Sequence, residues 1–156
     1  MSELIKSRSR VKELGEVFTP PHIVVKMLDL IPQDKLADPL STWLEPACGT
    51  GNFLIEILKR KLSYGAGATH ALKCLSSTYG IDISPENVLE SRDRLYRYVL
   101  LTVQCDDITG FLKQAQAILK ANIQVGNVLN PQDITVTQYH WHGDSFTRSS
   151  HRKSDL

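Results

Sequence analysis

The chain has 156 residues, of which 42% are hydrophobic and 22% are charged. These proportions are ordinary for a soluble globular protein, and the length predicts one domain. No apolar run approaches the roughly 20 residues that span a bilayer, and no signal-peptide pattern opens the chain, so we expect a cytoplasmic protein with no membrane partner. The formal net charge of +1 does not indicate a nucleic-acid binder, because DNA-binding domains usually carry a basic stripe.

The first predicted element is a helix over about residues 20–31, with Thr19 as its N-cap and Pro20 as its first residue. Apolar residues recur along it at helical spacing and predict one buried face. The polar segment 33–41 then predicts a loop, which leads to a short buried strand at about 42–45.

Helices and strands alternate through the next part of the chain, which favours a parallel, doubly wound sheet. A basic run at 59–61 falls where the first of these helices should end, and a favourable interaction with the helix dipole explains its position. The expected elements are a helix from 51 or 52 to about 61, a loop at 64–69, a helix at 70–75, a strand at 77–83, helices at 85–101 and 108–119, and a strand at 123–125.

The C-terminal part of the sequence predicts a β-hairpin. Residues 134–141 have strong strand propensity, and residues 145–149 can form the returning strand. Tyr139 and Trp141 could stack on nucleic-acid bases, but aromatic residues in a hairpin more often pack across the strands. The final residues, 151–156, are expected to be loosely held.

Cysteine and histidine residues give no sign of a metal site. Cys48, Cys74 and Cys105 are odd in number, lie far apart and lack metal-site spacing, so reduced thiols are expected. His140 and His142 would share one face of a strand, but no third ligand lies near them in the sequence.

The most informative segment is 43–54, which reads Trp-Leu-Glu-Pro-Ala-Cys-Gly-Thr-Gly-Asn-Phe-Leu. It predicts a buried strand that ends in a carboxylate, a tight glycine turn and the start of a helix. Gly49 and Gly51 supply backbone freedom and allow a ligand to approach the main chain. The Glu45 carboxylate suits a positive group or sugar hydroxyls. A P-loop is excluded, because it needs a Lys-Ser or Lys-Thr pair after its last glycine.

This pattern resembles the cofactor loop of S-adenosylmethionine-dependent DNA methyltransferases that modify adenine at N6. Upstream, residues 15–21 (Gly-Glu-Val-Phe-Thr-Pro-Pro) resemble the segment that closes over the methionine end of the cofactor. Downstream, residues 79–83 (Tyr-Gly-Ile-Asp-Ile) resemble the second strand, whose terminal carboxylate holds the ribose. The order of the segments is similar to that in Type I modification subunits and fused Type II restriction-modification enzymes. The resemblance covers roughly residues 15–130 and implies a partial Rossmann-like class I methyltransferase fold.

The resemblance implies a set of cofactor-binding residues. Glu45 would bind the methionine end, Asp82 the ribose hydroxyls, and Ile83 would pack on the adenine ring. Asn127 stands where the family usually has Asp, and its side-chain oxygen can accept a hydrogen bond from the adenine amino group; Asn is also common in such turns. The implied cofactor is S-adenosylmethionine, with S-adenosylhomocysteine as product, and the implied site comprises Phe18, Thr19, Glu45, Ala47, Gly49, Gly51, Asn52, Phe53, Asp82, Ile83 and Asn127.

The sequence departs from the family at the catalytic loop. Methylation of adenine N6 requires acceptors that hold the amine and an aromatic platform under the flipped base. The family supplies them with an Asn/Asp/Ser-Pro-Pro-aromatic loop. Residues 130–133 begin this pattern but lack the second proline and the aromatic residue, and residues 19–22 belong to the upstream cofactor segment. No catalytic residue is therefore identified, and the isolated chain is not expected to transfer methyl.

Three functional interpretations follow. The chain is the cofactor-binding part of an adenine-N6 DNA methyltransferase of a restriction-modification system, with its catalytic loop supplied from elsewhere. Alternatively it is a non-catalytic pseudo-methyltransferase, encoded by a phage or mobile element, that binds or regulates a restriction-modification partner. It could also be a degenerate gene remnant.

The chain is expected to comprise a basic, flexible arm (1–14), a cofactor-binding domain (15–130) and a hairpin with a tail (131–156). DNA contact has weak support from charge. Its nearest candidates are the basic residues of the arm: Lys6, Arg8, Arg10 and Lys12. Without a fourth parallel strand, the strand at 42–45 would have an open edge, so we expect the hairpin, a second copy or a partner chain to pair there.

Overall fold

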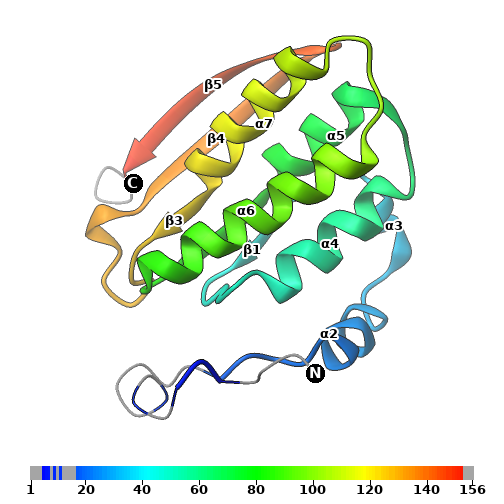
Figure 1. Ribbon diagram of the computed structural model, residues 1–156. Coiled ribbons are helices and arrows are strands. Elements are labelled where there is room, and N and C mark those ends of the chain that lie inside the picture. Colours follow the sequence, from blue (N-terminus) through cyan, green and yellow to red (C-terminus); the bar gives the residue numbers. More distant parts are fainter. Residues whose placement is uncertain (1–4, 8, 10, 12–16, 153–156) are drawn as a thin grey trace.

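The computed structural model describes residues 5–7, 9, 11 and 17–152 (Figure 1). The helices are α2 (Pro21–Leu28), α3 (Gln33–Ala37), α4 (Asn52–Leu62), α5 (Gly67–Ser76), α6 (Pro85–Thr102) and α7 (Ile108–Asn122), and a 3₁₀ turn, η1, covers Pro131–Asp133. The strands are β1 (Trp43–Glu45), β2 (Thr78–Asp82), β3 (Ile123–Val125), β4 (Thr135–His142) and β5 (Ser145–Arg152). None of the described helices is long and apolar enough to cross a lipid bilayer.

The strands form two separate sheets. β1, β2 and β3 are parallel and hydrogen-bonded in that order, with β2 in the middle. β4 and β5 form an antiparallel hairpin, in which Trp141 pairs with Phe146 across the strands. The predicted α/β class, with a parallel sheet, flanking helices and a C-terminal hairpin, is therefore confirmed.

Several element bounds differ from the expected ones. Pro20, not Thr19, is the N-cap of α2, and it makes no side-chain cap hydrogen bond. The following Pro21 disfavours the helical region for the residue before it, so Pro20 adopts a ψ of 143° and the helix begins one residue later. The expected loop at 33–41 contains the short helix α3, which Leu36 anchors in the core.

Other bounds extend beyond their expected ranges. α5 begins at Gly67, within the expected loop, although its buried residues start only at Ala71. β5 runs to Arg152, which places part of the expected tail in the hairpin. Residues 153–156 lie outside the described part of the chain.

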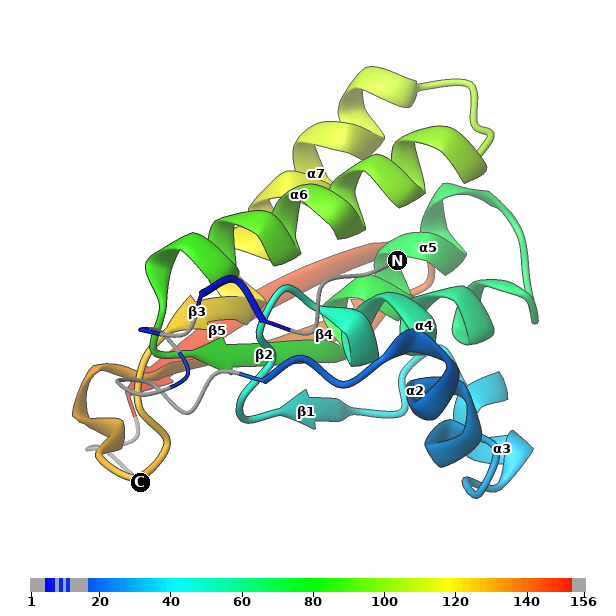
Figure 2. The same cartoon turned by 60° about the horizontal axis from the view of Figure 1, so that its bottom comes forward.

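The hydrophobic core lies between the parallel sheet and a layer of four helices (Figures 1 and 2). α4 and α6 pack beside each other, α5 packs against α4, and α7 packs against both α5 and α6. A second cluster joins α2 to α4 through Val24, Leu28 and Ile57. The main core includes Leu54, Leu58, Leu72, Leu75, Val88, Leu95, Val99, Phe111, Ile118 and Ile123.

The hairpin packs its aromatic residues inward, against α5 and α7. The ring centroids of Trp141 and Phe146 lie 4.8 Å apart. Trp141 Nε1 donates to Ser76 Oγ at 3.1 Å, and the Tyr139 hydroxyl donates to Asn122 Oδ1 at 3.0 Å. The expectation that these aromatic residues pack across the hairpin strands is confirmed.

The expectation that the hairpin could pair with the first strand is wrong. Within the described residues β1 pairs with β2 alone, and the hairpin is a sheet of its own. The Gln124 side chain on β3 explains the difference, since it binds both the N–H and the C=O of Thr135 at the start of β4, at 3.2 and 2.6 Å. This link directs the hairpin over α5 and α7, away from β1.

The basic run at 59–61 does more than complement the dipole of α4. Lys61 has an exposed fraction of 0%. Its ammonium group donates to Ser41 O at 2.7 Å and to Ser77 Oγ. Lys61 thus joins the chain before β1 to the chain before β2.

Candidate functional site

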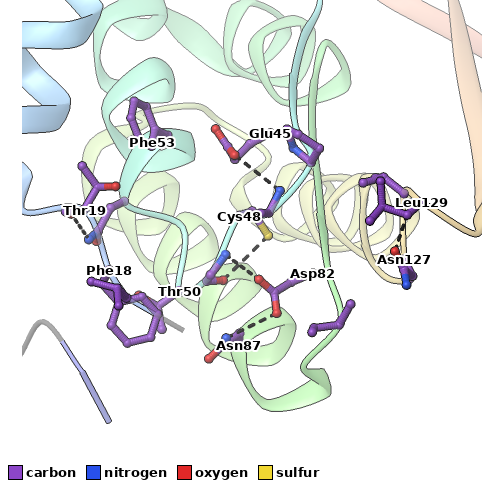
Figure 3. A pocket seen from close by; sticks show the side chains of 18 residues that line it. Phe18, Thr19, Glu45, Cys48, Thr50, Phe53, Asp82, Asn87, Asn127 and Leu129 are labelled. Atoms are coloured by element: carbon purple, nitrogen blue, oxygen red, sulfur yellow. Dashed lines mark hydrogen bonds between the residues drawn. The ribbon is translucent and has the colours of Figure 1, made fainter. Parts of the chain in front are cut away.

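The carboxyl ends of the three parallel strands meet at one edge of the sheet, where Figure 3 shows a cavity. Glu45 ends β1, Asp82 ends β2, and Gly126 and Asn127 follow β3. Residues 17–19 form another part of the wall, and the cavity volume is about 480 Å³. In open parallel sheets, ligands bind outside the carboxyl ends of the strands.

The chain turns sharply between β1 and α4. Gly49 has a φ of 52° and Gly51 a φ of 87°, in the region that favours glycine. A Cβ atom on Gly49 would lie 3.1 Å from a ring carbon of Phe18, and one on Gly51 would lie 2.5 Å from Ser91 Oγ. Both positions thus require glycine for the backbone angle and for a close contact. Among the residues that the structure describes, no side chain caps the start of α4, which leaves its first amide groups for solvent or a ligand.

Asp82 holds two loops together at the cavity. Its Oδ2 accepts a hydrogen bond from Gly49 N at 2.8 Å (Figure 3). Its Oδ1 accepts from Ser84 N at 2.8 Å and from Asn87 Nδ2 at 3.3 Å. The glycine turn and the start of α6 are therefore fixed by one carboxylate, whose oxygens can still accept a hydrogen bond from a ligand.

Glu45 faces the cavity with little compensation for its charge. Among the described residues, its carboxylate receives one hydrogen bond, a long one of 3.4 Å from Ala47 N. Burial raises the pKa of Glu45, and the Ala47 amide offsets only part of that shift. A positive group on a ligand would restore the stability of the charged form.

Cys48 is unsuited to nucleophilic chemistry although it lines the cavity. Burial, followed by the charges of Asp82 and Glu45, raises the pKa of the Cys48 thiol to about 12. The thiol is therefore protonated at neutral pH and acts as a packing group.

Asn127 uses its side chain to shape the loop that follows β3. Its Oδ1 accepts a hydrogen bond from Leu129 N at 2.9 Å, and its backbone C=O accepts one from Asn130 N at 2.9 Å. Leu129 itself is 91% exposed at the rim of the cavity. A hydrogen bond from Asn127 Oδ1 to a ligand would thus share an oxygen that already accepts one.

Ten of the eleven predicted cofactor-binding residues line this cavity, whereas Gly51 lies behind the wall, against α6. Their role in binding stays a prediction. Sequence reasoning did not assign the other eight wall residues, although Val17, Pro46, Cys48 and Thr50 lie inside the recognised segments 15–21 and 43–54. The missed residues are Val17, Pro46, Cys48, Thr50, Asn87, Gly126, Val128 and Leu129.

Lys6 contacts Asn87, a residue of the cavity wall. Its ammonium group lies 2.9 Å from Glu90 Oε2 and 3.3 Å from Glu86 Oε1, and it donates to Asn87 Oδ1 at 3.0 Å. The other basic residues that were considered for DNA contact, Arg8, Arg10 and Lys12, lie outside the described residues. The charge of Lys6 is directed toward α6.

Residues 4–89, more than half of the chain, match the family described as N-6 DNA Methylase. One relative is a Type II methyltransferase, M.VspI, of Vibrio sp. (strain 343). It is 36% identical over 89 residues, which are 57% of this chain and 18% of that protein. The matched part therefore spans less than a fifth of the relative's length. No solved structure matches the chain.

Proposed function

Since the chain belongs to the N-6 DNA methylase family, we propose that its cavity binds S-adenosylmethionine for adenine-N6 methylation of DNA. The observation that carries this proposal is the placement of two carboxylates, Glu45 and Asp82, at the ends of neighbouring parallel strands beside one glycine turn. S-adenosylmethionine has a positive amino group and sulfonium at one end and ribose hydroxyls at the centre, so the two carboxylates suit different parts of it.

The described residues fit this cofactor. Glu45, whose pKa burial raises, would receive the ammonium group of the methionine end. Asp82 would accept hydrogen bonds from the ribose, and Ile83 and Phe18 offer apolar surface at the wall. Bound there, the cofactor supplies an activated methyl group, and the role of this chain is to hold and orient it. The partial Rossmann-like fold supports the same assignment.

The proposal includes a limit on activity. The segment after β3 forms η1 and enters the hairpin, and the sequence has no Pro-Pro-aromatic run to hold a flipped adenine. The chain alone is therefore proposed to bind the cofactor without transferring its methyl group. Its setting would be a restriction-modification system in the cytoplasm, in keeping with three free cysteines.

The second candidate is a non-catalytic pseudo-methyltransferase that binds or regulates a restriction-modification partner. The hairpin favours this candidate. Tyr139 and Trp141 pack it against α5 and α7, so the segment that follows β3 is an ordered part of the fold rather than a catalytic loop. A labelled-methyl transfer assay on unmethylated DNA, with and without a modification subunit, separates the two. Transfer above that of the subunit alone supports the first candidate, and transfer below it supports the second.

Calorimetric titration with S-adenosylmethionine tests cofactor binding through Glu45→Gln, which keeps the size of the side chain and removes its charge. We expect the wild type to bind, and the variant to bind about 10- to 100-fold more weakly because a charge-assisted hydrogen bond is lost. Wild-type affinity should fall as the pH drops through the raised Glu45 pKa, since protonation removes the same charge. The variant should lack this step.

Asp144→Asn is the matched control, because Asp144 is an exposed carboxylate at the hairpin turn and is not part of the cavity wall. It should bind like the wild type at every pH. A wild-type protein that does not bind S-adenosylmethionine would rule out both candidates. Equal binding by Glu45→Gln would remove Glu45 from the site.

A further inference from the structure

A hydrogen-bonded chain runs from α6 through the start of α4 to the segment before α2. Arg94 Nη1 donates to Asn52 Oδ1 at 2.9 Å, and Asn52 Nδ2 donates to Thr19 O at 2.9 Å. Arg94 Nη1 also donates to Thr50 O at 2.6 Å and lies 3.3 Å from Thr50 Oγ1. One guanidinium group therefore contacts the glycine loop and, through an amide, the opposite wall of the cavity.

The chemistry of arginine fixes the direction of this chain. A guanidinium group has donors and no acceptor, so the oxygen of the Asn52 amide must face Arg94. The amide NH₂ group must then point the other way, toward Thr19 O. Without Arg94 the amide oxygen would lose its donor, and the hydrogen bond to Thr19 O alone would hold the Asn52 side chain.

The segment held in this way lies where position matters. Phe18 packs so closely on the glycine turn that a Cβ on Gly49 would approach its ring to 3.1 Å. Phe18, Thr19 and Asn52 all line the cavity, whereas Arg94 does not. Among the described residues, no carboxylate forms a hydrogen bond with the Arg94 side chain, and burial lowers the pKa of Arg94. Arg94 thus donates hydrogen bonds to oxygen atoms of the loop and forms no ion pair with a described residue.

We propose that Arg94 is a positioning residue that holds Phe18 and Thr19 over the methionine end of the cofactor by orienting the Asn52 amide. This inference rests on the proposed function for the identity of the ligand. The latch itself, Arg94 to Asn52 to Thr19, is a property of the free protein.

Arg94→Met tests the latch by removing the donors while keeping a long side chain. Hydrogen exchange of the ligand-free protein should become faster in segment 17–20 and remain unchanged in α7. Affinity for S-adenosylmethionine should fall about tenfold, because the released segment must be ordered again when the ligand binds. Affinity for adenosine, which lacks the methionine end, should change less than twofold.

Three further variants make the result specific. Arg94→Lys keeps a positively charged donor group at the end of a long side chain and should recover part of the affinity. Asn52→Asp keeps an acceptor for Arg94 but has no donor for Thr19 O, so it should release segment 17–20 as Arg94→Met does. Arg97→Met is the control, because Arg97 lies on the same helix with a side chain that is 71% exposed and pairs with Asp93.

Each outcome decides the proposal. An equal loss of affinity for S-adenosylmethionine and adenosine, or unchanged exchange in segment 17–20, would overturn it, because Arg94 would then only stabilise the whole pocket. A wild type that binds neither ligand would refute the proposed function. In that case faster exchange in both Arg94→Met and Asn52→Asp would still establish the latch, and unchanged exchange would reject it.

Discussion

Gly51 shows how a single hydrogen atom in place of a side chain sets the geometry of the glycine turn. Its φ of 87° and the nearby Ser91 Oγ both oppose a Cβ atom. Gly67 has a similar φ of 82°, but nothing lies within 4 Å of a Cβ placed there. Alanine would be strained by the backbone angle at both positions, but only at Gly51 would it also meet a close contact. Substitutions at the two positions therefore separate the two effects.

We expect Gly67→Ala to lower the free energy of unfolding by about 1 kcal/mol, the cost of a left-handed backbone for alanine. Gly51→Ala should lower it by about 2 to 4 kcal/mol, because α6 must also move away from the new methyl group. Urea denaturation of both variants measures the difference. Equal decreases in the free energy of unfolding would mean that α6 moves away from the methyl group without an energetic penalty.

Lys61 makes the stability of the protein depend on pH, which its position in the sequence does not indicate. Burial lowers the pKa of Lys61 from 10.5 to about 8. Between these values the unfolded chain holds the proton more tightly than the folded chain, so the contribution of Lys61 to stability rises with pH across this window. Below pH 8 both states are protonated, and the cost of burying the charge is fully present.

Lys61→Met removes this titration. Urea denaturation of both proteins should show the stability of the wild type rising relative to that of Lys61→Met between pH 8 and pH 10. The comparison cancels the titration of the tyrosines and cysteines that both proteins contain. Lys59→Met, at a neighbouring exposed lysine, should show no such relative change. If the difference in stability between the wild type and Lys61→Met does not vary with pH in this range, Lys61 stays charged in the folded protein.

Among the elements, β1 has a free edge within the described part of the sheet. Trp43 N donates to Ser77 O at 2.8 Å, and strand alternation then directs the N–H and C=O groups of Leu44 away from β2. The Leu44 side chain is 59% exposed as well. An open edge of this kind is a template for strand pairing. We infer that a second copy or a partner chain pairs along β1.

The Leu44 amide reports directly on this pairing. Its hydrogen exchange should slow as the protein concentration rises, in step with dimer formation measured by sedimentation. The Trp43 amide, already bonded to Ser77, serves as the internal reference. Fast exchange at Leu44 in a protein that stays monomeric would exclude the second copy and leave the partner chain.

The sequence predicted the elements whose signals are local. The helix expected from residue 85 does begin at Pro85 as α6, where the Ser84 side chain accepts a hydrogen bond from Asn87 N. Glu45 was identified because it ends a short predicted strand, and Asp82 because residues 79–83 resemble the second strand of the family. The helix α3 was missed because its anchor, Leu36, lies in a short segment that is mostly polar. Its burial depends on where α4 passes, which no local pattern records.

At the scale of the whole molecule, the sequence could indicate which residues gather at the cavity but not what holds them there. Arg94 and Ser91 show only helical spacing in the sequence, and their contacts with the glycine turn arise from the crossing of α6 over α4. Lys61 looked like an ordinary basic residue at a helix end. The path of the hairpin was also beyond prediction, since it depends on contacts between residues distant in the sequence, such as Gln124 with Thr135 and Trp141 with Ser76.

The cavity draws its wall from segments around residues 18, 45–53, 82–87 and 126–129, and this has a consequence for the order of folding. The hairpin joins neighbouring segments and can close within about 1–10 μs. The parallel sheet must bring distant segments together and is expected to form more slowly. The cavity is then completed only when the sheet is. A ligand of this cavity therefore cannot guide early folding steps, but it can trap the finished fold and slow its unfolding.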